Sequence, residues 1–588
     1  MRALLLAAAL AFVSSANAAP VQRKPVTRTL KAPVVKAAPI ATRAVAPPRK
    51  RIPLSKKGIA ARIAFTKSGE LRTSPDVIGR RAEPLTLEEQ TAKRIEALMR
   101  GPLRSSLTGL YVADAKTGQP IFSVNADEPL NPASNVKMIS TATSLELLGA
   151  DFRYPTRVLG PEPIDGVVHG DVYLLGSYDP TLTATDLDDL AGAVAVRGIK
   201  EVDGDIVVGS DPVRDGIYRA VIPIEVTAGE NGAPPTAAST IGADHVSIVI
   251  TAKTARSPMR PRLTYSAVTT KSATGIPLIT LTIGGVMGKG GSSVYQLATK
   301  ERTATAAYAL RAALRAKGVA VQGDYKIAEL GDFTGEAIVS GNLPVELARH
   351  ESKRLAEIIA QVNKFSINWL ADRVVLTATA LARHQAPSMD ASIDAMYSWL
   401  ERNAHIQRKD LLIDTGSGLS YKTEITTTEL VAIVRAAAGF MNAVPASSTP
   451  TIAPVEDPLA KAWIESLSIA GTDGTLRHRV RNATARIRGK TGTLSTAIAM
   501  SGIMDIDPDR PLVFSLVTNT DTPLAKPYIR KAHDRVVGEL CHYLAATQHK
   551  TSLPSTETTP TTGEPPDDNT EETAPHDDAL DAEAAGAK

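Results

Sequence analysis

The chain has 588 residues, of which 43% are hydrophobic, and its formal net charge is +4. This length exceeds what one ordinary hydrophobic core can hold, so two or more domains are expected. Cys541 is the only cysteine, which excludes an internal disulfide, and its apolar neighbours predict a buried side chain in a terminal helix.

Residues 1–18 have the features of a secretory signal peptide. They combine one positive charge at Arg2, an apolar run from Leu4 to Val13 and a small-x-small site that ends at Ala18. The apolar run is about half as long as a membrane span requires. The sequence therefore predicts a soluble, exported protein that is periplasmic or otherwise extracytoplasmic.

Both ends of the remaining chain are predicted to be disordered, and their charges are opposite. Residues 19–82 hold 16 Lys and Arg against 2 acidic residues and are rich in Pro and Ala, whereas residues 549–588 form an acidic tail. The basic arm could hold the protein near an anionic surface such as lipid head groups or cell-wall polymers. A solvated spacer is an equal alternative.

The folded part begins with a helix predicted near residues 87–99. The stretch "GLYVADAKTGQPIFSVN" follows as two alternating strands that a turn at residues 116–118 joins into a hairpin. From about residue 155 to 330, short β segments alternate with glycine turns, which predicts a β-rich insertion. Later patterns predict helices at residues 346–384, 393–402, 427–441 and 526–546, and strands at residues 485–490, 496–505 and 511–519.

This order predicts one α/β domain that a long insertion splits. A hairpin and a helix come from its first part, and strands and a helix come from its last part. We expect the split domain to comprise residues 83–155 and 340–548, and the β-rich insertion to comprise residues 156–339.

The stretch "NPASNVKMISTATSLELLGA", residues 131–150, predicts a helix that is buried on most of its circumference. Lys137 stands three residues after Ser134, so both side chains lie on one helix face. A serine hydroxyl is a poor nucleophile until a base takes its proton, and desolvation can lower the pKa of a lysine enough for that role. The pair predicts an activated nucleophile. Ser and Lys are common, however, so a chain of this size is expected to contain on the order of one or two Ser-x-x-Lys spacings by chance.

Penicillin-binding proteins and serine β-lactamases combine a Ser-x-x-Lys motif with Ser-x-Asn and Lys-Thr-Gly motifs. Lys-Thr-Gly occurs at residues 116–118, where it is a hairpin turn, and at residues 490–492 in "ARIRGKTGTLSTAIAMSG". The second copy lies at a predicted strand edge, where a substrate backbone could pair with it.

Ser-x-Asn motifs begin at Ser123, Ser340 and Ser366. Ser123 precedes the nucleophile and is set aside by chain order. Ser366 is favoured over Ser340 because "QVNKFSINWLADRVV" is helical and apolar, so the polar pair of Ser366 and Asn368 needs a purpose there.

The ordered set "SNVK", "SIN" and "KTG" resembles the D-alanyl-D-alanine carboxypeptidase/endopeptidase family, the class C low-molecular-mass penicillin-binding proteins. The stretches "GSYDPTL", "VDGDIVVGSD", "DTGSGLS" and "IAGTDGTLRHR" are also similar to that family, and the resemblance covers about residues 95–548. It implies a serine β-lactamase/DD-peptidase-like domain with an antiparallel sheet flanked by helices.

The resemblance implies a role for each catalytic residue. Ser134 would attack the carbonyl of the penultimate D-alanine of a cell-wall stem peptide and form an acyl-enzyme, with Lys137 as general base. Ser366 would relay a proton to the leaving D-alanine nitrogen, and Asn368 would orient the substrate amide.

The resemblance also implies the substrate-binding residues. Lys490 and Thr491 would bind the terminal carboxylate, and Gly492 would let the peptide approach closely. The backbone N–H groups of Ser134 and Thr493 would form the oxyanion hole. Expected partners are peptidoglycan stem peptides, with β-lactam antibiotics as inhibitors and no nucleic acid; no metal or other cofactor is required.

Three positions depart from the family pattern. Ile367 stands where the family often has Asp, Tyr421 and Lys422 follow "GLS" where it commonly has Arg, and the insertion shows no Trp-containing aromatic stretch in "IYRAVIPIEVTAGENGAPPTAAST". The sequence does not decide between trimming of the terminal D-alanine and cleavage of cross-links.

Other functions fit the sequence less well. A serine β-lactamase would have its first two motifs far closer together than the 232 residues between Ser134 and Ser366. No G-x-S-x-G elbow and no H-E-x-x-H motif occurs, which weakens a Ser-His-Asp hydrolase and a metallohydrolase. A catalytically silent cell-wall binding protein of the same fold stays open, although a pure binder needs no buried lysine beside a serine.

Overall fold

The computed structural model describes residues 85–209, 221–240, 243, 245–271, 277–298, 302–328, 344–441, 457–523 and 525–548. All the residues predicted for the site lie within these ranges. The predicted signal peptide, basic arm and acidic tail lie outside them, as does the alternative Ser340.

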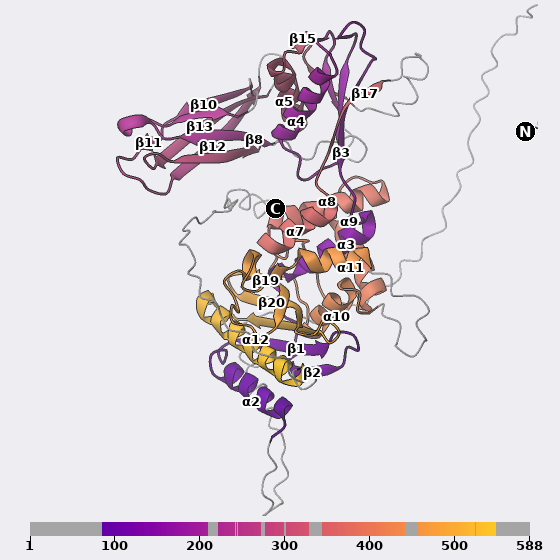
Figure 1. Ribbon diagram of the computed structural model, residues 1–588, viewed down its shortest axis with the longest axis vertical. Helices are drawn as coiled ribbons and strands as arrows, with labels where there is room; N and C mark the ends of the chain where they lie inside the picture. Colours follow the sequence, from indigo (N-terminus) through magenta and orange to yellow (C-terminus); the bar gives the residue numbers. More distant parts are fainter. Residues whose placement is uncertain are drawn as a thin grey trace, which may run out of the picture. The chain divides into compact units, whose positions relative to one another are not determined.

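A six-stranded antiparallel sheet forms the centre of the split domain (Figure 1). Its strand order is β18-β19-β20-β21-β1-β2. The strands are β1 (Leu107–Asp114), β2 (Pro120–Val124), β18 (Ser468–Ile469), β19 (Arg486–Thr493), β20 (Ala497–Asp505) and β21 (Leu512–Asn519). Because β1 pairs with β21 along its whole length, the first and last parts of the chain form one sheet, as predicted.

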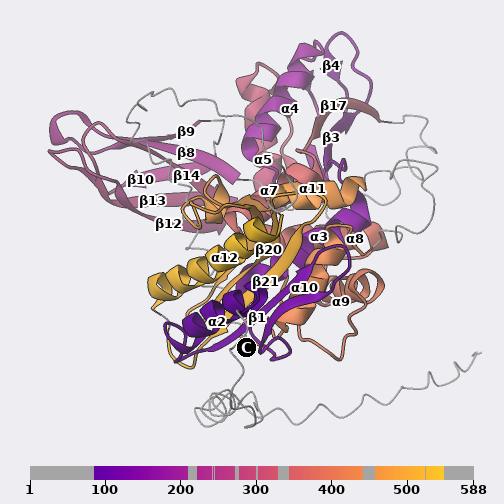
Figure 2. The ribbon, with the colours of Figure 1, turned by 60° about the horizontal axis from the view of Figure 1, so that its bottom comes forward.

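Helices cover both faces of this sheet (Figure 2). On one face α2 (Leu87–Arg100) and α12 (Lys526–Gln548) pack on each other, and their core includes Cys541, which is buried as predicted. On the other face α10 (Thr427–Ala437) contacts β1, β20 and β21. The fold class, an α/β domain with an antiparallel sheet between helices, is therefore confirmed.

The remaining helices of the split domain pack around α3 (Lys137–Leu148). They are α7 (Leu355–Phe365), α8 (Asn368–Arg383), α9 (Met389–Trp399) and α11 (Pro458–Ser466). Most of α3 is buried, as its apolar sequence predicts. In the part of the chain that the structure describes, none of the helices is both long enough and apolar enough to cross a bilayer.

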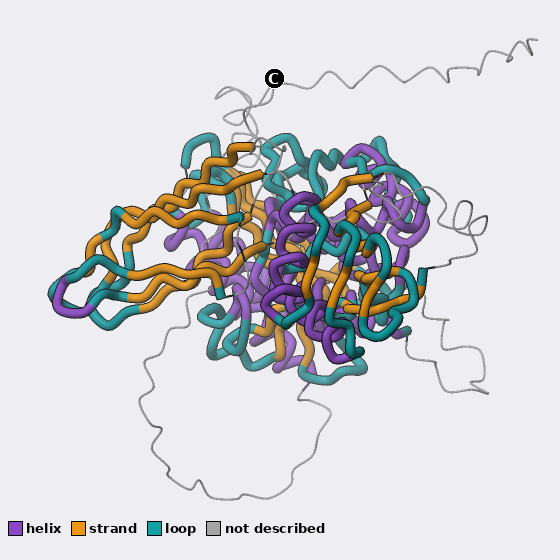
Figure 3. Tube along the Cα trace, turned by 90° about the horizontal axis from the view of Figure 1, so that it is seen from above, coloured by secondary structure: helices purple, strands orange, loops and turns teal. Residues whose placement is uncertain are grey.

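In the residues that the structure describes, the insertion contains four small sheets and two α-helices. Figure 3 shows its strands and helices from above. The helices, α4 (Ala184–Val196) and α5 (Arg302–Ala316), pack on each other and were not expected from the sequence. Helix α5 is buried on most sides and so lacks a clear polar face, whereas α4 buries a regular apolar stripe that was overlooked. The strands are β3 (Pro155–Gly160), β4 (Val167–Val168), β5 (Val172–Leu175), β6 (Glu201–Val202), β7 (Ile206–Gly209), β8 (Val221–Thr227), β9 (Thr236–Ser239), β10 (Val246–Ile250), β11 (Lys253–Thr254), β12 (Arg262–Lys271), β13 (Pro277–Met287), β14 (Ser292–Ala298), β15 (Ala320–Val321), β16 (Tyr325–Ala328) and β17 (Val345–Glu351).

The helix predicted from residue 346 was wrong at its start. Residues Val345–Glu351 form β17, which pairs with β3, and α7 begins at Leu355. Strand pairing outweighs local helical pattern here. The buried apolar core of the insertion accordingly runs from Val158 to Ala348, and the domain boundaries at 155/156 and 339/340 stay a prediction.

A Gly-Asp pair stands immediately before each of three parallel strands, a repeat that was not predicted from the sequence. The pairs are Gly170-Asp171 before β5, Gly204-Asp205 before β7 and Gly323-Asp324 before β16. Asp171 Oδ1 accepts a hydrogen bond from the Asp205 N–H (2.8 Å), and Asp205 Oδ1 accepts one from the Asp324 N–H (2.7 Å). The aspartates thus link each strand start to the next.

Replacing Gly204 with alanine is expected to lower the free energy of unfolding by about 2 kcal/mol or more, because the new Cβ overpacks a rigid contact. That Cβ would lie 2.2 Å from the carbonyl carbon of Gly170. The matched control is Gly192→Ala in α4, where the nearest atom lies 3.9 Å away and the helix gains up to about 1 kcal/mol. Urea unfolding followed by circular dichroism checks both, and equal stability of the two variants would contradict the repeat's close packing.

Candidate active site

Ser134 lies in a 3-10 turn, Ala133–Val136, immediately before α3. The expected helix from residue 131 therefore begins as a tighter turn, and the α-helix itself starts at Lys137. Two side-chain hydrogen bonds hold the turn: Asn131 Oδ1 accepts from the Ala133 N–H (2.8 Å), and the buried Asn135 Nδ2 donates to Ser501 Oγ on β20 (2.7 Å). The nucleophile candidate is thus fixed against the central sheet.

Lys137 is completely buried, and its amine contacts Ser134. Its Nζ lies 3.0 Å from Ser134 Oγ, 2.7 Å from Asn368 Oδ1 and 2.6 Å from the carbonyl oxygen of Ser417. The amide and carbonyl oxygens can only accept hydrogen bonds, whereas the serine hydroxyl can also donate. When the amine is neutral and donates to these two acceptors, its lone pair can face the Ser134 hydroxyl; the buried carboxylate of Asp372 also interacts electrostatically with this amine.

Ser366 and Asn368 lie at the break between two helices, not inside one helix as the sequence indicated. α7 ends at Phe365, Ser366 adopts the left-handed conformation (φ 58°, ψ 38°), and α8 begins at Asn368. A left-handed serine costs about 1 kcal/mol, a strain that often accompanies function. The break lets Ser366 and Asn368 both line the pocket that Ser134 lines.

Lys490 is the second completely buried lysine of the site. Its Nζ donates to Ser366 Oγ (2.8 Å) and to the carbonyl oxygen of Thr491 (2.6 Å). Burial, and secondly repulsion from Lys137, hold the pKa of Lys490 well below its ordinary value. This repulsion favours a state in which one of the two amines is neutral.

The end of β19 is left open beside the nucleophile turn. β18 pairs with β19 at Arg488 and Gly489, so its pairing stops before residues 490–493. A Cβ on Gly492 would lie 2.5 Å from the Pro132 carbonyl oxygen and 3.1 Å from the Ser134 nitrogen. Gly492 thus permits close contact between the strand and the turn, and brings the backbone of β19 next to Ser134.

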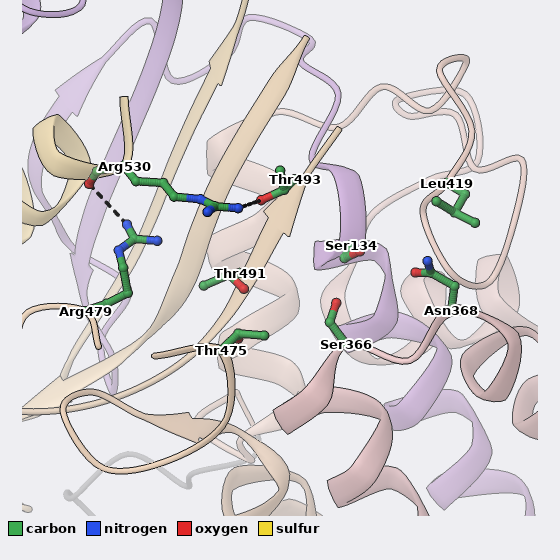
Figure 4. Close-up of a pocket in the computed structure, with 9 residues that line it drawn as sticks. All are labelled: Ser134, Ser366, Asn368, Leu419, Thr475, Arg479, Thr491, Thr493 and Arg530. Carbon is green, nitrogen blue, oxygen red and sulfur yellow. Dashed lines mark hydrogen bonds between the residues drawn. The ribbon is translucent and has the colours of Figure 1, made fainter. Parts of the chain in front are cut away.

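These elements enclose a pocket of about 400 Å³. Figure 4 shows Ser134, Ser366 and Thr491 facing a common space. The predicted residues Asn368 and Thr493 also line it, whereas Lys137, Lys490 and Gly492 support its wall. The lining residues are Ser134, Ser366, Asn368, Leu419, Thr475, Arg479, Thr491, Thr493 and Arg530.

Four of the lining residues were not predicted to belong to the site. Leu419 lies in "DTGSGLS", and Thr475 and Arg479 lie in "IAGTDGTLRHR", so the quoted stretches were the available signal. Nothing in the local pattern pointed to Arg530, because it lies in the closing helix α12.

Tyr421, the residue after "GLS" that departs from the family pattern, makes a specific contact near the pocket. Tyr421, where the family commonly has Arg, hydrogen-bonds through its hydroxyl to Ser495 Oγ (2.7 Å), just beyond the end of β19. The loop that carries Ser417 and Leu419 is thereby joined to the strand that carries Thr491 and Thr493.

Comparisons with known proteins agree with this arrangement. The D-alanyl-D-alanine carboxypeptidase of Actinomadura sp. (strain R39) is 28% identical over 458 residues, which cover 72% of this chain and 80% of that protein. Carboxypeptidase DacB of Mycolicibacterium smegmatis is 26% identical and covers 76% of this chain and 83% of that protein. The crystal structure of penicillin binding protein 4 (dacB) from Haemophilus influenzae has the same fold, with a TM-score of 0.55 and 19% identity over 76% of this chain and 99% of that one.

The family model described as the D-Ala-D-Ala carboxypeptidase 3 (S13) family matches residues 91–540. The match includes the nucleophile turn, the helix break and β19. Since it spans most of the chain, this protein belongs to the D-Ala-D-Ala carboxypeptidase 3 (S13) family of peptidases.

Proposed function

We propose that this protein is a serine DD-peptidase that cleaves peptidoglycan stem peptides after the penultimate D-alanine through an acyl-enzyme at Ser134. The observation that carries the proposal is the 3.0 Å contact between Ser134 Oγ and the buried Lys137 Nζ. A serine paired with a desolvated amine can be activated as a nucleophile. The named relatives are carboxypeptidases, which agrees with this reaction.

In acylation the neutral Lys137 amine takes the proton of the Ser134 hydroxyl while Oγ attacks the carbonyl carbon of the penultimate D-alanine. The N–H groups of Ser134 and Thr493 stabilise the negative oxygen of the tetrahedral intermediate, because fixed donors need no reorganisation. Ser366 then passes its hydroxyl proton to the leaving D-alanine nitrogen and is reprotonated by the proton that Lys137 took from Ser134, while Lys490, 2.8 Å away, orients the Ser366 hydroxyl. Water releases the acyl group in the second half of the reaction.

Asn368 links the catalytic amine to the substrate. Its Oδ1 accepts from Lys137, so its Nδ2 is left to donate to a carbonyl oxygen of the stem peptide. The open edge of β19 at residues 490–493 pairs with the extended peptide backbone. Thr491 contributes its hydroxyl to binding of the terminal carboxylate at this edge, with Lys490 behind it.

The same geometry serves two substrates. A terminal D-alanine and a cross-linked peptide both present a carbonyl of D-alanine to Ser134, so we propose both carboxypeptidase and endopeptidase activity. The substrate lies outside the cytoplasm, which agrees with export directed by residues 1–18. The basic residues 19–82 are proposed to bind anionic cell-wall or lipid surfaces.

The test is product analysis. The purified protein is incubated with an acylated tripeptide that ends in D-alanyl-D-alanine and with a purified cross-linked muropeptide dimer, with and without prior exposure to benzylpenicillin. Release of D-alanine or of monomers, blocked by the drug, is expected. Rapid hydrolysis of the drug with no peptide cleavage would indicate a β-lactamase, and no reaction with peptide or drug would indicate a silent binder; either result overturns the proposal.

A further inference from the structure

The pocket contains an arginine that the mechanism above does not use. Arg530, in the first turns of α12, reaches across to β19, where its Nη2 donates to Thr493 Oγ1 (3.2 Å; Figure 4). Its side chain is half-buried and lines the same space as Ser134 and Thr491. A guanidinium in this position is a charged group at the substrate-binding edge.

Arg530 has no carboxylate within ion-pair distance among the residues that the structure describes, unlike its neighbour Arg479. Arg479 Nε contacts both carboxylate oxygens of Asp534, at 2.7 and 2.9 Å. Arg479 Nη2 also donates to the backbone carbonyl oxygen of Arg530 (3.2 Å). Asp534 and Arg479 therefore hold the first turns of α12 in place while the Arg530 charge stays available to the pocket.

The electrostatics of the pocket favour an anion beside Arg530. Burial, and secondly repulsion from Arg479, lower the pKa of Arg530, while a weaker attraction to Asp534, which is already paired with Arg479, opposes this shift. A bound carboxylate would offset the repulsion further. Lys490, another basic side chain at this edge, is completely buried and already donates to Ser366 and Thr491. The more accessible positive charge for a ligand is therefore Arg530.

We propose that Arg530 is a specificity-determining residue that binds the C-terminal carboxylate of the substrate together with Thr493. This inference rests on the proposed function. The Thr493 hydroxyl accepts from Arg530 and donates its own proton to one carboxylate oxygen, while the remaining guanidinium N–H groups bind the carboxylate directly. Arg479 is a positioning residue that acts through the backbone of Arg530.

The test compares acylation by benzylpenicillin, which carries a carboxylate, with acylation by its uncharged methyl ester. Acylation rate constants are measured by intact-mass spectrometry for the unmodified protein, Arg530→Gln, Arg530→Lys and the control Lys531→Gln, an exposed neighbour on the same helix. Arg530→Gln should slow acylation by the acid about 10- to 100-fold, the loss typical of a charged hydrogen bond. Its rate with the ester should stay unchanged, Arg530→Lys should lose less, and Lys531→Gln should lose nothing.

Any other result contradicts the proposed role of Arg530. Equal losses with acid and ester would mean that Arg530 only supports the fold, and no loss with the acid would mean that the carboxylate binds elsewhere. No acylation of the unmodified protein by either compound would overturn the proposed function itself, and the carboxylate site with it.

Discussion

Replacing Ser134 with alanine is expected to abolish covalent labelling by benzylpenicillin and to reduce D-alanine release by at least about a thousandfold, because no other nucleophile can form the acyl-enzyme. The hydrogen bonds that hold the turn come from Asn131 and Asn135, so loss of Oγ leaves its geometry intact. Intact-mass spectrometry after exposure to the drug is the direct measurement.

Ser123→Ala is the matched control for this experiment. Ser123 begins another Ser-x-Asn motif, but it is exposed in β2 of the hairpin and is not among the residues that line the pocket. The control should label at the rate of the unmodified protein. An adduct that persists in Ser134→Ala, or that disappears in Ser123→Ala, would show that the nucleophile had been assigned to the wrong serine.

That the three motifs gather around one pocket could be predicted, because the proposed chemistry needs particular residue types in a fixed order. Ser134 and Lys137 depend on helical spacing alone, and Lys490 lies on a strand with a clear pattern. The break at Ser366 could not be predicted, because a left-handed residue between two apolar helices leaves no mark on hydrophobic periodicity.

Residues that reach the pocket from distant elements escaped prediction for a different reason. Arg530 lies in a helix whose local pattern reports only which face packs on the sheet, so its contact with Thr493 depends on the tertiary fold. The strand β17 and the buried helix α5 were missed because partner strands and surrounding core, rather than propensity, determine their conformation.

The Gly-Asp repeat shows the same limit within the insertion. Each pair looks like an ordinary turn in the sequence, and its meaning depends on parallel neighbours that lie 34 and 119 residues apart in the chain. A side chain at position 204 would clash with the backbone of Gly170, so only glycine fits there. No local sequence pattern encodes this contact. In both domains, the features that could not be predicted depend on contacts between residues far apart in the chain, which local sequence patterns do not encode.

Replacing Lys137 with alanine is expected to slow acylation by benzylpenicillin by about 10² to 10⁴-fold, the usual contribution of a positioned base. The change also leaves Asn368 Oδ1 and the Ser417 carbonyl oxygen without their donor, so a stability loss of about 1 to 3 kcal/mol is expected as well. Acylation by intact mass and urea unfolding are therefore measured on the same samples, with the exposed Lys353→Ala as control.

A Lys137→Arg variant separates the base from the structural contact. Arginine can still donate to Asn368 and Ser417, but it cannot lose a proton in a protein, so it cannot take the proton of Ser134. If Lys137 is the base, Lys137→Arg acylates as slowly as Lys137→Ala, even where unfolding shows that its stability is recovered. Recovery of acylation in Lys137→Arg would instead mean that the lysine holds the loop at Ser417 and that another group activates Ser134.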